Sequence, residues 1–163
     1  MRDEVALAAE FESWVTRLEM TYRAVRYTCG HRLGDLDAGG RIAAQVVASM
    51  LARPKVFRYS GLPFSGRIAR VAEPLLVAAA TDPARFDPGS PSTWAQIEDG
   101  VRAMPQAARH AFIGLIVLDS GEEDLAASLG TTVTSLRSDH AAALEHLRTL
   151  TGDVGPGEHV KGV

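Results

Sequence analysis

The amino-acid sequence predicts an all-α protein made of two small helical domains joined by a proline-rich linker. Apolar residues recur at helical spacing, alanine, leucine and arginine are abundant, and alternating runs of Val, Ile or Thr are nearly absent. Residues 81–93 contain three prolines and one glycine and separate two such helical stretches. The chain has 163 residues, of which 46% are hydrophobic, so it can form one domain or two small ones.

The first helix is expected over about residues 5–28, where apolar side chains form one stripe, and Gly30 and Gly34 are expected to end it. The second contains apolar residues at helical spacing over 42–50 and ends before Pro54. Both belong to the predicted first domain.

A third helix is expected over about 65–80, with Pro74 kinking or splitting it. Residues 81–93 follow as a stiff, extended linker. The first domain is therefore predicted to cover residues 1–80.

The second domain is predicted to cover residues 94–152, followed by a flexible tail, 153–163. Residues typical of helix ends mark its helices. They are Thr93 with Gln96, Pro105, Ser120 with Glu123, Gly130, and Thr131 or Thr132.

The net charge of −3 is unevenly distributed along the chain. Residues 1–80 contain 11 Lys or Arg and 8 Asp or Glu, a balance of +3, whereas residues 94–152 contain 4 and 8, a balance of −4. This asymmetry indicates different partners for the two halves.

The sequence favours a cytoplasmic protein that is not an enzyme. Cys29 is the one cysteine, no apolar run reaches membrane-spanning length, and the start is charged rather than apolar. The histidines do not have the spacing of metal ligands. His31 lies close to Cys29 in the sequence, but no residue is placed to orient that histidine as a catalytic base. We expect neither a metal nor a cofactor.

Residues 122–143 have the spacing of a helix-turn-helix. Ala126 is small enough for two helices to cross, Gly130 can adopt the positive φ of a tight turn, and Leu136 can anchor the second helix in a core. The alternative is an ordinary antiparallel helix pair with a glycine turn.

A series of motifs between residues 104 and 148 extends this pattern. They are Met104-Pro105, Arg109, Glu122-Glu123, Leu125-Ala126, Leu129-Gly130 and Leu147-Arg148. Their order resembles the −35-binding domain, region 4, of extracytoplasmic-function sigma factors of bacterial RNA polymerase. The resemblance implies a recognition helix that reads promoter DNA. Its candidate reading residues are Thr132, Thr134, Ser135, Arg137 and Ser138.

The first half resembles region 2 of the same family, so the resemblance covers about residues 15–150. Residues 32–38 resemble the entry to the polymerase-binding helices, which implies core RNA polymerase as a partner of Asp37, Arg41 and Gln45. Residues 57–70 resemble the segment that binds the −10 element. Its candidate DNA-binding residues are Arg58, Tyr59, Phe64, Arg67 and Arg70.

Cations interleaved with aromatic residues over 53–70 also suit single-stranded DNA, because bases stack on aromatic rings and cations neutralise the backbone. The alternative is a basic loop whose aromatic side chains fill the core of the first domain. The composition of this segment fits both interpretations.

Three departures from the family shape the functional hypotheses. Gly39-Gly40-Arg41 stands where the family is acidic, the tryptophan usual before Ile68 is missing, and the recognition helix keeps a single cation, Arg137. The first hypothesis is a sigma-factor-like protein that binds core RNA polymerase and promoter DNA to start transcription. The alternative is a sigma-like interaction protein that binds an anti-sigma factor or polymerase without promoter recognition.

Overall fold

The computed structural model describes residues 2–57, 66–88 and 93–151, and all regular structure in these ranges is helical, as predicted. The α-helices are α1 (Arg2–Leu33), α2 (Leu36–Ala52), α3 (Gly66–Thr81), α4 (Trp94–Arg102), α5 (Gln106–Phe112), α6 (Glu122–Leu129) and α7 (Val133–Thr149). A 3₁₀ turn, η1 (Pro83–Arg85), and a π-helical turn, η2 (Ile113–Val117), complete the described elements.

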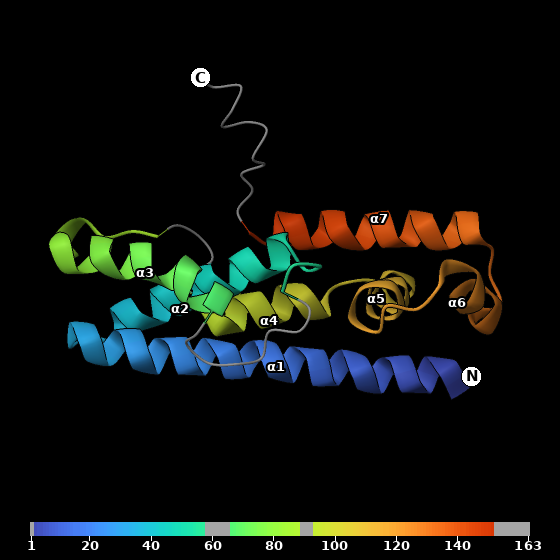
Figure 1. The fold of residues 1–163 in the computed structure, drawn as a ribbon, viewed down its shortest axis with the longest axis horizontal. Coiled ribbons are helices and arrows are strands. Elements are labelled where there is room, and N and C mark those ends of the chain that lie inside the picture. Colours follow the sequence, from blue (N-terminus) through green and yellow to red (C-terminus); the bar gives the residue numbers. More distant parts are fainter. Residues whose placement is uncertain (1, 58–65, 89–92, 152–163) are drawn as a thin grey trace, which may run out of the picture.

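Helix α1 extends along the whole molecule and contacts helices from both halves of the sequence (Figure 1). With 32 residues it is about 48 Å long. Helices α2 and α3 pack toward its C-terminal half, whereas α5 and α6 lie near its N-terminal half. Helix α7 lies across the molecule from α1 and contacts α2 and α5.

Helix α1 is longer than the predicted 5–28 because Gly30 does not end it. Gly30 is buried, and a Cβ atom there would lie 2.6 Å from Cδ2 of Leu36, so the missing side chain makes room for α2. The helix ends at Gly34, whose φ of +67° suits glycine. Asp35 then caps α2 by accepting hydrogen bonds from the backbone N–H groups of Asp37 and Ala38.

Helices α1 and α2 cross at near backbone contact, which accounts for the first departure from the family pattern. A Cβ atom on Gly39 would lie 2.6 Å from both the Arg26 carbonyl oxygen and the Gly30 nitrogen. Any side chain at this position would force the helices apart. Gly39 is therefore a packing residue at the crossing.

Helix α3 continues through Pro74 without a break, so of the two predicted outcomes, a kink or a split, the split is wrong. Proline leaves the carbonyl group of Arg70 without its helical N–H partner. Both residues are exposed, so water can satisfy that carbonyl. The linker prediction also needs correction, because residues 83–85 form a 3₁₀ turn and Phe86 packs against the core.

The two halves share one set of buried side chains. The cluster extends from Leu7 to Leu147 and joins α1 and α2 to α4, α5, α6 and α7. At its centre the rings of Trp14 and Phe112 meet edge to face with centroids 4.8 Å apart. The predicted domains 1–80 and 94–152 are therefore packed together, and their boundary stays a prediction; the predicted tail, 153–163, lies outside the described residues.

Local signals identified most helix ends in the second half. Thr93 and Gln96 form the predicted capping box at α4, and the side chain of Thr132 caps α7 by accepting from the Ser135 N–H at 3.0 Å. The capping box predicted at Ser120 is wrong. Gly121 occupies the cap position there, and the Ser120 N–H donates to the carbonyl oxygen of Gly114 instead.

Candidate nucleic-acid interface

The turn between α6 and α7 has the features that the sequence predicts for two helices crossing at a glycine corner. Gly130 has a φ of +69° and its N–H donates to the carbonyl oxygen of Ala127, closing α6. Ala126 and Leu136 are both buried, at 3% and 1% exposure. The two helices are thus fixed against each other and against the core behind them.

All five candidate reading residues at the start of α7 are exposed. The hydroxyl of Thr132 caps the helix, so its oxygen already accepts a hydrogen bond from the backbone N–H of Ser135. Thr134 and Ser138 lie four residues apart and therefore share one face of α7. The structure brings the predicted set together within seven consecutive residues, from the cap Thr132 to Ser138.

Arg137 is paired within the protein. Its guanidinium donates to both carboxylate oxygens of Glu122, at 3.0 Å from Nε and 2.8 Å from the terminal nitrogen. This hydrogen bonding holds the pKa of Glu122 below its usual range and raises that of Arg137. Spacing alone does not reveal Glu122 as this partner, because the two residues are 15 positions apart and meet only through the turn between α6 and α7.

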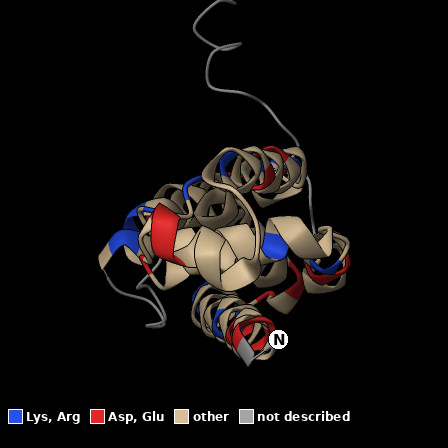
Figure 2. Ribbon diagram, turned by 90° about the vertical axis from the view of Figure 1, so that its right-hand side faces the viewer, with Lys and Arg blue, Asp and Glu red and all other residues tan. Residues whose placement is uncertain are grey.

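The surroundings of this surface are acidic. Glu123 and Asp124 follow Glu122 in the first turn of α6, and Asp3 and Glu4 lie in the first turn of α1. Figure 2 views this end of the molecule and shows acidic segments at the N-terminus of α1. Glu4, Asp139 and Ser135 line the same hollow. These charges oppose phosphate binding in the arrangement observed.

The candidate −10-binding residues are only partly visible. Arg58, Tyr59 and Phe64 lie outside the described residues. Arg67 and Arg70 are exposed in the first turns of α3, three residues apart and so on one side of the helix. The described residues thus place two cations of this set together.

The three candidate polymerase-binding residues follow one strip of α2. Asp37, Arg41 and Gln45 are spaced by four, and most other residues of the helix are buried. Asp37 is exposed, but Arg41 is half-buried and its guanidinium carbon lies 6.0 Å from the centre of the Phe86 ring. Oε1 of Gln45 is buried and has no hydrogen-bond partner among the described residues. Only the end of this strip at Asp37 is exposed to solvent.

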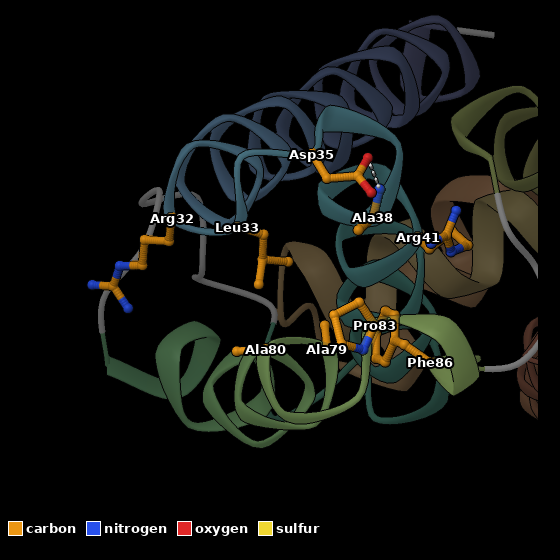
Figure 3. A pocket seen from close by; sticks show the side chains of 9 residues that line it. All are labelled: Arg32, Leu33, Asp35, Ala38, Arg41, Ala79, Ala80, Pro83 and Phe86. Atoms are coloured by element: carbon orange, nitrogen blue, oxygen red, sulfur yellow. Dashed lines mark hydrogen bonds between the residues drawn. The ribbon is translucent and has the colours of Figure 1, made fainter.

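Arg41 also lines a cavity of about 220 Å³ where the end of α1, the start of α2, the end of α3 and η1 meet (Figure 3). Leu33, Ala79, Pro83 and Phe86 supply apolar walls, and the Asp35 carboxylate is directed toward the backbone of Ala38. The side chain of Arg32 extends away from the cavity. The linker residue Phe86, which sequence reasoning missed, therefore covers part of the candidate polymerase surface.

Two arginines in the second half join it to α1. Arg102 donates to both carboxylate oxygens of Glu12, at 2.8 and 3.1 Å, and also bonds Glu98. Arg109 donates to the backbone carbonyls of Met104 and Arg102, and its guanidinium carbon lies 4.5 Å from the centre of the Phe11 ring. Arg109 is the arginine of the family-like motif, and here it fixes the packing between the halves.

The described residues contain no group of three or more His, Cys, Asp or Glu side chains able to hold a metal. Burial raises the pKa of the Cys29 thiol to about 11, which makes it a poor nucleophile. His146 bonds the Gly100 carbonyl at 2.7 Å. None of the described helices is long and apolar enough to cross a membrane.

Comparison with known proteins adds no relative. No family model, no curated protein and no solved structure matches the chain.

Proposed function

We propose that this chain is a sigma-factor-like transcription protein with a region 2-like domain, 1–80, and a region 4-like helix-turn-helix domain, 94–152, which binds core RNA polymerase and promoter DNA. The observation that supports this most is the turn between α6 and α7. Its glycine is left-handed, Ala126 and Leu136 are buried, and the polar start of α7 is exposed. Helix-turn-helix proteins present their second helix to the major groove in this way.

The proposed roles follow the exposed chemistry. Thr134 and Ser138 on α7 read base edges, because their hydroxyls can donate and accept hydrogen bonds. Arg67 and Arg70 neutralise phosphates. Asp37, at the open end of the α2 strip, contacts polymerase. The protein acts in the bacterial cytoplasm, without catalytic chemistry of its own.

The test is promoter-directed transcription in vitro with core RNA polymerase, the full chain and a library of double-stranded templates. The proposal predicts transcripts with defined start sites that depend on the added protein. Random initiation, at the level given by core polymerase alone, would remove the claim that this chain starts transcription.

A second candidate function is a sigma-like interaction protein that binds an anti-sigma factor or polymerase without recognising promoters. The Arg137–Glu122 pair supports this alternative, because a paired arginine adds little to phosphate binding. The cover of Phe86 over Arg41 and the acidic end of the molecule also fit it.

DNA binding by the full chain at low salt separates the two functions. The full chain is needed because the halves share one core. Binding to duplex DNA that weakens steeply with salt favours the transcription factor, since each phosphate contact releases counterions. Binding to polymerase without any binding to DNA favours the interaction protein.

A further inference from the structure

A groove of about 350 Å³ lies between the end of α2 and helix α7. Two of its lining residues, Arg53 and Lys55, also begin the basic and aromatic stretch 53–70. One wall comes from the end of α2 and the residues that follow it, and the other from α7 with the π-helical turn η2 beneath. The lining residues used below are Leu51, Arg53, Lys55, Ile116, Leu144 and Arg148. The groove therefore bridges the two halves of the sequence.

The floor of the groove is aliphatic. Leu51 and Ile116 belong to the shared core, at 2% and 7% exposure, and Leu144 packs against that core. Among the described residues no Phe, Tyr or Trp side chain lines the groove, and the one aromatic ring in the lining is the imidazole of His140. The floor suits an alkyl chain better than a nucleobase.

Cations approach the groove from both walls. Arg53 and Lys55 lie on the α2 side and Arg148 on the α7 side, and none of the described residues that line the groove is acidic. Lys55 forms no ion pair with any residue in the described ranges. Arg148 bonds Glu145 at 2.5 Å, but both side chains are about half exposed or more, so the pair is weak and can be replaced.

His140 adds a polar atom that lacks a partner. Its ring lines the groove, and Nε2 is buried without a hydrogen bond to any described residue. Buried polar nitrogens are normally bonded, because an unmade hydrogen bond destabilises the folded state. Nε2 itself is closed to solvent, so the ligand contacts proposed below rest on the cations and the aliphatic floor.

We propose that this groove binds a small amphipathic anion, a phosphate or carboxylate joined to an aliphatic chain. The aliphatic part of the ligand packs on Leu51, Ile116 and Leu144. Its anionic group lies among Arg53, Lys55 and Arg148. Because the ligand contacts both α2 and α7, it stabilises the packing of the two halves. This inference stands apart from the proposed function.

Calorimetric titration of the full chain with octyl phosphate and with octanoate tests it, alongside melting temperatures. At least one of the two binds at one site and raises the melting temperature, and their ranking identifies the anionic group. Inorganic phosphate and octanol bind much more weakly, because each has half of the required chemistry. The proposal is overturned if neither amphipathic anion binds, or if octanol or inorganic phosphate binds as tightly.

Paired substitutions locate the site. Lys55→Gln combined with Arg148→Gln weakens binding about tenfold or more, because charge-assisted contacts are lost. Arg23→Gln with Arg85→Gln removes the same charge from side chains that are 76% and 88% exposed and do not line the groove, and it leaves binding unchanged. If the first variant does not fold, the single change Lys55→Gln gives the same comparison. Equal loss in groove and control variants, or no loss in the groove variant, contradicts the assignment.

Discussion

Glu122 at the start of α6 accepts two hydrogen bonds from Arg137 near the start of α7. Arg137 is the one Lys or Arg between residues 110 and 147, so this pair occupies the cation best placed to meet a DNA phosphate. The carboxylate takes the position that a phosphate would take in a bidentate contact. Any DNA binding by α7 must therefore compete with Glu122.

Glu122→Gln is expected to strengthen binding to duplex DNA by releasing Arg137. The slope of log affinity against log salt should steepen by about 0.9, the value for one added phosphate contact. Fluorescence anisotropy of a labelled duplex across a salt series measures this. Glu123→Gln is the matched control, since it removes the same charge in the same turn and should leave the slope unchanged. Identical slopes for both variants would show that the pair does not restrain Arg137.

Glu12→Gln is expected to lower the free energy of unfolding by about 0.5–1 kcal/mol at pH 7, the upper range for exposed ion pairs, because Arg102 bonds both carboxylate oxygens. The hydrogen bond from Arg102 lowers the pKa of Glu12 from its ordinary 4.5. Its contribution is thus present above pH 4.5 and is lost as the pH falls through the folded-state pKa.

Urea unfolding at pH 7 and at about pH 3 measures the Glu12 effect. The difference between wild type and variant should shrink at the acid pH. Glu10→Gln changes a carboxylate two residues away and should have little effect at either pH. If the loss in free energy of unfolding is the same at both pH values, the charge of Glu12 is not the cause of the loss.

Phe112→Ala is expected to destabilise the whole molecule by about 3–5 kcal/mol, because its ring is fully buried against Trp14 of α1. Since the halves share one core, hydrogen exchange should accelerate in α2 as well as in α5. Val77→Ala, at a side chain 61% exposed, serves as the control and should change stability by less than about 0.5 kcal/mol. Acceleration restricted to residues 94–151 would contradict a shared core.

Gly39→Ala and Gly40→Ala test the crossing of α1 and α2. The added methyl group at Gly39 meets backbone atoms at 2.6 Å, and overpacking of this kind costs about 1–3 kcal/mol. At Gly40 the nearest atoms are the ends of the Tyr22 and Arg26 side chains, at 3.3 and 3.4 Å, which can move. In thermal unfolding, the melting temperature of Gly39→Ala should lie far below that of Gly40→Ala. Equal melting temperatures would argue against the close crossing.

Local signals in the sequence predicted the helical class and most helix ends. Thr93, Gly130 and Thr132 act through neighbours within a few residues, so their roles are readable from spacing. The role of Gly30 is not readable in this way, because it depends on helix α2, which packs against it. A glycine at a helix crossing and a glycine at a helix end look alike in sequence.

The candidate site was harder to predict because its limits come from distant residues. The five polar residues at the start of α7 lie where spacing placed them. The pairing of Arg137 with Glu122, and the contact of Phe86 with Arg41, join residues that are 15 and 45 positions apart. Such pairs are set by how the helices pack, which periodicity does not specify.

Binding of the labelled full chain to core RNA polymerase, titrated to micromolar concentration, tests the sigma-like assignment most directly. Saturable one-to-one binding is expected, and Asp37→Lys should weaken it because Asp37 is the exposed end of the α2 strip. Asp99→Lys, an exposed acid on α4, should leave it unchanged. No binding at micromolar polymerase, or equal binding by wild type and Asp37→Lys, would contradict the account.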